Sequence, residues 1–63
     1  MRYVVQYVHD NPGCCKYHAA SYNTHYGYAA VNRCIRHGYI TCDWTDGGVS
    51  VLKITPAGLQ YIA

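Results

Sequence analysis

Two Cys–His pairs of equal spacing are the residues of this 63-residue chain best suited to metal chemistry. His18 lies three positions after Cys15, and His37 lies three positions after Cys34, so each pair would share one side of a helical turn. Zinc binds four such sulfur and nitrogen ligands in a tetrahedral arrangement. Cys34, however, falls on an apolar helix face, where cysteine packs as a small hydrophobic residue. We therefore expect Cys34 to pack in the core and His18 and His37 to be surface groups near helix ends, with no metal bound, and we expect no cofactor.

The adjacent thiols of Cys14 and Cys15 are the other reactive candidates. They would sense oxidants if a positive charge such as that of Lys16 stabilised a thiolate. The sequence begins with no secretion signal, so we expect a cytoplasmic protein whose thiols stay reduced. Cysteine and histidine also serve as nucleophile and base, but no nucleophile elbow, phosphate-binding loop or acid pair accompanies them. We do not expect an enzyme.

The segment from Tyr26 to His37 offers hydrogen-bonding chemistry. At helical spacing one side is apolar, with Val31, Cys34 and Ile35, and the other side is polar, with Asn32, Arg33 and Arg36. In the major groove of DNA, Arg can form two hydrogen bonds with guanine, and Asn can do the same with adenine. The polar side therefore fits a DNA-reading face, whereas the simpler interpretation is an ordinary solvated helix surface.

Three helices are expected to position these residues. The first covers Arg2 to His9 with an apolar stripe of Met1, Val5 and Val8, although its β-branched residues also suit a strand. After an Asp-Asn-Pro-Gly turn, a second helix runs from about Cys14 to Tyr22, with Cys15, Ala19 and Tyr22 on one face and Lys16 exposed. The third helix is the Tyr26–His37 segment, with Thr24 as its cap and Gly38 as its stop.

A β-hairpin and a short helix are expected to follow. Alternating residues from Tyr39 to Thr45 and from Val49 to Ile54 flank Asp46-Gly47-Gly48. A two-residue turn would pair Ile40 with Lys53, whereas a three-residue loop pairs Ile40 with Ile54 and Cys42 with Leu52. The hydrophobic pattern favours the three-residue loop, with Ile40, Cys42, Leu52 and Ile54 toward the helices. Thr55 then caps a helix that begins at Pro56 and turns Leu59 and Ile62 to the core.

This order resembles the winged helix-turn-helix DNA-binding proteins. The resemblance rests on Val31…Cys34-Ile35-Arg36-His37-Gly38-Tyr39-Ile40 and on Ile54-Thr55-Pro56-Ala57-Gly58, which echoes the family's aliphatic-Thr-x-x-Gly turn. The Pro-Gly turn and the Gly-Tyr-Ala-x-Val-Asn-Arg run look like those of short versions from bacteriophages and mobile elements. The resemblance implies one α+β domain over residues 1–63, with three helices, a two-stranded wing and a short C-terminal helix.

The same resemblance implies a recognition helix in the major groove and a wing near the neighbouring backbone. It assigns the reading positions to Tyr28, Ala29, Asn32, Arg33 and Arg36. On chemical grounds, Lys16 on the preceding helix and the tyrosine hydroxyl groups are expected to hold phosphates.

The wing departs from the family pattern. Its tip carries Asp43 and Asp46 without Lys or Arg, so we expect no insertion into the minor groove. Thr45 and Lys53, on the outer strand face, are better candidates for backbone contact. The acidic tip also supports an alternative, in which the domain binds or mimics a protein partner, for example as a viral modulator of a host protein.

Composition permits both interpretations. A net charge of +2, with 13 % charged residues, allows DNA binding without requiring it. No apolar run approaches the roughly 18 residues of a membrane span. We expect sequence-specific binding of double-stranded DNA, as a small transcriptional regulator, with homodimerisation as a means to extend a small contact area.

Overall fold

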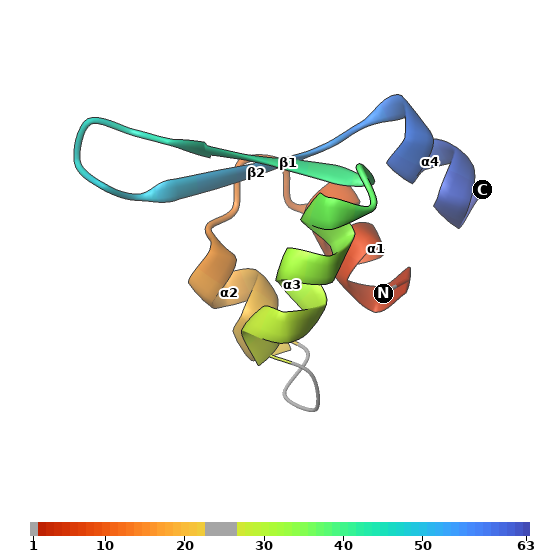
Figure 1. Cartoon of the computed structure of the whole chain (residues 1–63), viewed down its shortest axis with the longest axis horizontal. Helices are drawn as coiled ribbons and strands as arrows, with labels where there is room; N and C mark the ends of the chain where they lie inside the picture. The colour runs from red at the N-terminus through yellow and green to blue at the C-terminus, as the bar shows by residue number, and fades with distance from the viewer. Residues whose placement is uncertain (1, 23–26) are drawn as a thin grey trace.

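The structure, a computed structural model, describes residues 2–22 and 27–63. These residues form four helices and an antiparallel hairpin (Figure 1). In chain order the elements are α1 (Arg2–Asp10), α2 (Lys16–Tyr22), α3 (Gly27–Arg36), β1 (Ile40–Trp44), β2 (Ser50–Ile54) and α4 (Pro56–Ile62). The prediction of an α+β chain with this order of elements is confirmed. Among the described residues, no helix has both the length and the apolar character needed to cross a membrane.

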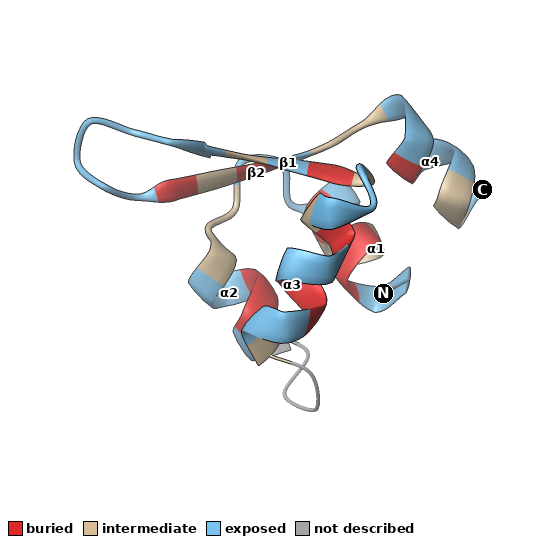
Figure 2. Ribbon diagram, viewed as in Figure 1, coloured by how far each residue is buried: buried red, intermediate tan, exposed pale blue. Residues whose placement is uncertain are grey.

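The core lies between α1, α2, α3 and the hairpin. It contains ten buried apolar residues, which are Val4, Val5, Val8, Ala19, Ala20, Ala30, Val31, Cys34, Ile40 and Leu52. The inner sides of α1 and α3 are buried, whereas the side of α3 that faces the viewer in Figure 2 is largely exposed. The valines of α1 therefore form a helical stripe and not a strand, as predicted, with Val4 in addition to Val5 and Val8. Met1 lies outside the described residues.

The second helix begins later than predicted, at Lys16 and not at Cys14. Backbone hydrogen bonds join Gly13 and Cys14, which precede it, to Leu52 of β2. The Gly13 amide donates to the Leu52 carbonyl at 2.9 Å, and the Leu52 amide donates to the Cys14 carbonyl at 2.8 Å. The Lys16 amide then donates to the buried Ser50 hydroxyl at 2.8 Å. Tertiary hydrogen bonds therefore exclude Cys14 and Cys15 from the helix.

The end of α3 agrees with the predicted glycine stop. Gly38 has φ +79°, the left-handed conformation that glycine adopts without strain. Its amide donates to Ile35 at 3.0 Å, and the Tyr39 amide donates to Cys34 at 3.1 Å, which is the Schellman pattern. The buried side of α3 includes Ala30, whereas Ile35 is only half-buried. The predicted start at Tyr26 and the predicted cap Thr24 lie outside the described residues.

The hairpin has the register predicted from its hydrophobic pattern. Ile40 pairs with Ile54, and Cys42 pairs with Leu52. Thr45 closes the loop, because its amide donates to the Val49 carbonyl at 2.9 Å and its carbonyl accepts from the Gly48 amide at 2.9 Å. Ile40 and Leu52 are buried against the helices, and the distal end of the hairpin extends beyond them (Figure 1).

Helix α4 starts as predicted and faces the core differently. The Thr55 hydroxyl accepts from the Gly58 amide at 3.0 Å, which confirms the cap. Leu59, predicted to be in the core, is 46 % exposed, because Gly58, Tyr61 and Ile62 form the side that packs inward. Tyr61 stacks on Tyr39 with ring centroids 4.3 Å apart. Helix α4 is therefore present as predicted, but a different side of it is buried.

Candidate nucleic-acid interface

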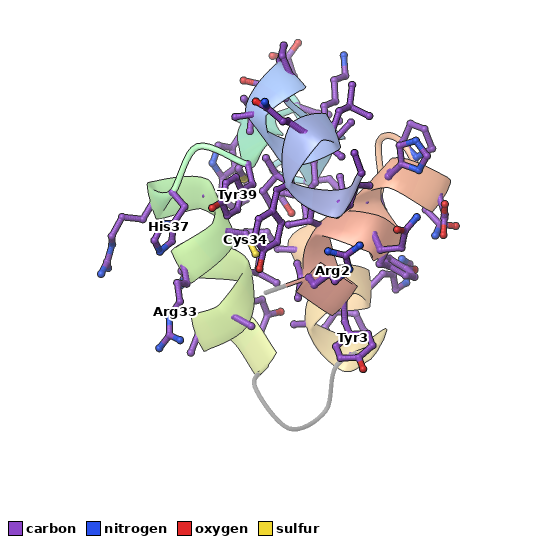
Figure 3. All side chains as sticks on the ribbon, turned by 90° about the vertical axis from the view of Figure 1, so that its right-hand side faces the viewer. Arg2, Tyr3, Arg33, Cys34, His37 and Tyr39 are labelled. Carbon is purple, nitrogen blue, oxygen red and sulfur yellow. The ribbon has the colours of Figure 1, made fainter. Side chains whose placement is uncertain are left out.

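The outer face of α3 presents five exposed residues along the helix axis. These are the positions Tyr28, Ala29, Asn32, Arg33 and Arg36. In Figure 3, Arg33 projects away from the body of the protein on the same side as His37, whereas Cys34 points inward. At ~1.5 Å per residue, this helix is about as long as a major groove is wide, ~12 Å. The helix therefore offers base-reading side chains on a surface that a DNA groove can cover.

Lys16 links α2 to this face of α3. Its Nζ donates to Asn32 Oδ1 at 2.8 Å and lies 6.0 Å from the centroid of the Tyr28 ring. An ammonium group only donates hydrogen bonds, so the contact orients Asn32 with its Oδ1 toward Lys16 and leaves its Nδ2 as a donor elsewhere. The expectation that Lys16 is exposed is wrong, since it is half-buried against α3. Lys16, Tyr28 and Asn32 thus form one contact group.

The charges of the chain are segregated around this group. The three carboxylates belong to Asp10, Asp43 and Asp46, so neither α2 nor α3 contains one. Asp10 contacts His9 at 3.2 Å at the end of α1, and Asp43 and Asp46 lie exposed on the hairpin. Three of the five Lys and Arg residues, Lys16, Arg33 and Arg36, lie on α2 and α3. The surface of these two helices is therefore positive.

The two predicted contacts on the hairpin are placed apart from the helical group. Lys53 is exposed and pairs with Thr41, and both alternate with the helix-facing residues of their strands, so Lys53 lies on the outer sheet face. The Thr45 hydroxyl accepts from the Val49 amide at 3.2 Å and so contributes to the loop. The structure brings Lys16 together with the α3 positions, but it does not bring Thr45 or Lys53 to them.

An open groove adjoins the α2–α3 surface and was not predicted. It has a volume of about 330 Å³ and lies between the start of α2, the start of α3 and the distal part of the hairpin. The groove is lined by Cys15, Lys16, Tyr17, Tyr28, Trp44, Gly48, Val49 and Ser50. One signal in the sequence points to it. Trp44 has the same strand parity as Ile40 and Cys42, so it must face the helix side of the sheet.

The cysteines are all thiols, and they differ in accessibility. Cys34 is fully buried, and burial raises the pKa of its thiol. Burial also raises the pKa of Cys14, with a smaller contribution from neighbouring Cys15. Within residues 2–22 and 27–63, no three His, Cys, Asp or Glu side chains are grouped in a way that could hold a metal ion. A raised pKa reduces the thiolate fraction that redox sensing requires.

The comparisons with known proteins add no family to this description. The chain matches no protein-family model, no curated protein and no solved structure. The geometry and charge of the α2–α3 surface are therefore the basis on which its function is inferred.

Proposed function

We propose that the chain is a winged helix-turn-helix protein that binds double-stranded DNA in a sequence-specific manner, with α3 in the major groove. One observation carries the proposal. Exposed Asn32, Arg33 and Arg36 share the outer face of α3 with the Lys16 contact, and neither α2 nor α3 contains a carboxylate. Phosphates approach such a surface without repulsion, and the amide and guanidinium groups have the donors that distinguish bases.

Each side chain has a distinct role in this proposal. Arg33 and Arg36 read guanine, and the Nδ2 of Asn32 donates to adenine N7 while Lys16 holds its oxygen. Lys16 also provides a positive charge for the DNA phosphate that flanks the major groove. Thr45 and Lys53 take no part, because they lie away from this surface. The biological role that fits these contacts is a small transcriptional regulator, and a homodimer would present two α3 helices to paired half-sites.

Selection of bound fragments from a random duplex pool tests this proposal most broadly. The purified chain should enrich one motif that contains a guanine, and its affinity for that motif should fall steeply with salt as counterions are released. Sedimentation of the complex gives the number of chains per site. Bound fragments that share no enriched motif, together with an affinity that does not change with salt concentration, would contradict the proposal.

A second candidate function is favoured by the exposed carboxylates of the hairpin. Asp43 and Asp46 have no ion-pair partner among the described residues, and both lie away from the cationic helices. A basic protein partner would pair with them, which makes the hairpin a protein-docking element. A pull-down with the wild-type chain, repeated with Asp43→Ala and Asp46→Ala, distinguishes this function, because its partner is lost with the carboxylates and not with the arginines of α3.

A further inference from the structure

The exposed apolar side chains of this molecule are concentrated around the groove. Six large apolar residues are exposed in the described part of the chain: Tyr3, Tyr17, Tyr28, Trp44, Val49 and Leu59. Four of them, Tyr17, Tyr28, Trp44 and Val49, line the groove, although they come from α2, α3 and the hairpin. A patch of exposed apolar side chains from separate elements indicates a binding surface, whereas single exposed apolar residues do not.

Trp44 contributes most of this surface. It is 65 % exposed, and none of the described rings stacks on it. It pairs with Ser50 at the loop end of β1 and shares the strand parity of the helix-facing residues Ile40 and Cys42. Tyr17 is 64 % exposed, and its ring contact among the described residues is an edge contact with His18 at a centroid distance of 5.8 Å. Both rings therefore keep a free face toward a ligand.

The groove is also cationic. Among the described residues that line it, Lys16 is the only charged one and none carries a carboxylate. Lys16 Nζ lies 6.0 Å from the Tyr28 ring centroid. Aromatic faces beside one ammonium group, without acids, are complementary to a flat ring that carries an anion, and a nucleotide has both features.

We propose that this groove binds one unpaired nucleotide of a DNA strand, with its base stacked on the exposed rings and its phosphate at Lys16. This inference rests on the proposed DNA binding, which it deepens. The volume of about 330 Å³ lies at the lower end of ligand sites, ~300–1,000 Å³, and so suits one nucleotide. Lys16 and Tyr28 belong both to the groove and to the α2–α3 surface. A strand that contacts α3 therefore reaches the groove directly.

The openness of the groove favours a nucleotide in a strand over a free small molecule. Small-molecule sites usually enclose most of the surface of their ligand. Here Trp44 and Tyr17 are 65 % and 64 % exposed, so the groove would enclose little of a free ligand, whereas a strand also contacts α3. A base inside a duplex is stacked between its neighbours and has no free ring face, so the proposed ligand is duplex DNA with an adjacent unpaired base, such as a junction or an extruded base.

Tryptophan fluorescence and anisotropy test the proposal together, because Trp44 is the only tryptophan of the chain. The probes are a blunt duplex, the same duplex with a short thymidine tail on either strand end, the tail alone and thymidine monophosphate. We expect the tail to raise duplex affinity by roughly 5- to 150-fold, the range of one base–aromatic stack, and to quench Trp44. Trp44→Ala and Tyr17→Ala should remove this gain and leave blunt-duplex affinity unchanged.

Tyr3→Ala is the matched control, because Tyr3 is 70 % exposed on α1 and lies outside the groove. The thymidine tail should raise the duplex affinity of this variant as much as it raises that of the wild type. If the blunt duplex binds but the tail neither raises the affinity nor quenches Trp44, the stacking site is overturned and the proposed function is left intact. Tail binding and quenching without blunt-duplex binding would support the stacking site and contradict the duplex proposal. Equal quenching by thymidine monophosphate and by the tail would overturn the assignment to a strand.

Discussion

At the scale of single residues, Cys34 shows how one thiol serves packing. It is fully buried between α1 and α3 in the core, in agreement with the interpretation of its sequence position (Figure 3). We expect Cys34→Ala to lower the free energy of unfolding by about 1 kcal/mol and Cys34→Ser to lower it more, because burying a hydroxyl costs more free energy than burying a thiol. Urea denaturation of the three proteins measures this order. A Cys34→Ser protein as stable as the wild type would show that the site is not apolar.

The same thiol predicts how stability depends on pH. Burial raises the native pKa of Cys34 above the ordinary value of 9.0, so the native state holds its proton more tightly than the unfolded state does. The stabilisation is therefore complete below about pH 9 and is lost as the pH rises through the native pKa. Cys34→Ala should show a smaller loss of unfolding free energy in alkaline urea titrations than the wild type. Cys14, whose pKa is also raised by burial, contributes to the loss in the same direction.

At the scale of elements, Gly58 joins α4 to the hairpin. A Cβ at this position would collide with the Tyr39 carbonyl oxygen and with the Ile54 side chain. We expect Gly58→Ala to reduce stability by roughly 1–3 kcal/mol through overpacking, although alanine is the better helix former. Gly47→Ala is the control, because its Cβ would only approach Thr45 Oγ1 at 3.9 Å. Equal urea midpoints for both variants would contradict this close packing.

The hairpin supplies a second prediction at this scale. Asp43→Lys and Asp46→Lys each replace an exposed anion of the hairpin with a cation and so raise the net positive charge of the chain. We expect either change to strengthen non-specific duplex binding and to steepen its dependence on salt. Anisotropy titrations at several salt concentrations provide the measurement. Complete loss of duplex binding in either variant would mean that the carboxylate makes a required contact.

At the scale of the whole molecule, local signals predicted the order of elements and the hairpin register. The stop at Gly38 and the cap at Thr55 depend on neighbours in the chain, and the pairing of Ile40 with Ile54 follows from strand parity. The late start of α2 was not predictable in this way, because hydrogen bonds from Leu52, distant in sequence, hold Cys14 outside the helix.

The residues of the candidate site also divide into those that local sequence predicts and those that depend on how the elements pack. Asn32, Arg33 and Arg36 were predictable from helical spacing, whereas Tyr28 and Ala29 were assigned from the resemblance to winged helix-turn-helix proteins. The contact between Lys16 and Asn32 and the groove beneath Trp44 depend on how α2, α3 and the hairpin pack, and no local pattern contains that information. Leu59 illustrates the opposite error, in which an apolar residue was assigned to the core although its side of α4 faces outward.

The central claim is that the outer face of α3 reads DNA, and it is tested most directly by anisotropy with the motif selected from the random pool. We expect Arg33→Ala and Arg36→Ala each to weaken binding to that motif by ~1–3 kcal/mol. Lys53→Ala removes the same charge from the outer sheet face and should weaken binding much less. Thermal unfolding confirms that all three variants fold. Unchanged affinity in both α3 variants, or an equal loss in Lys53→Ala, would contradict the claim.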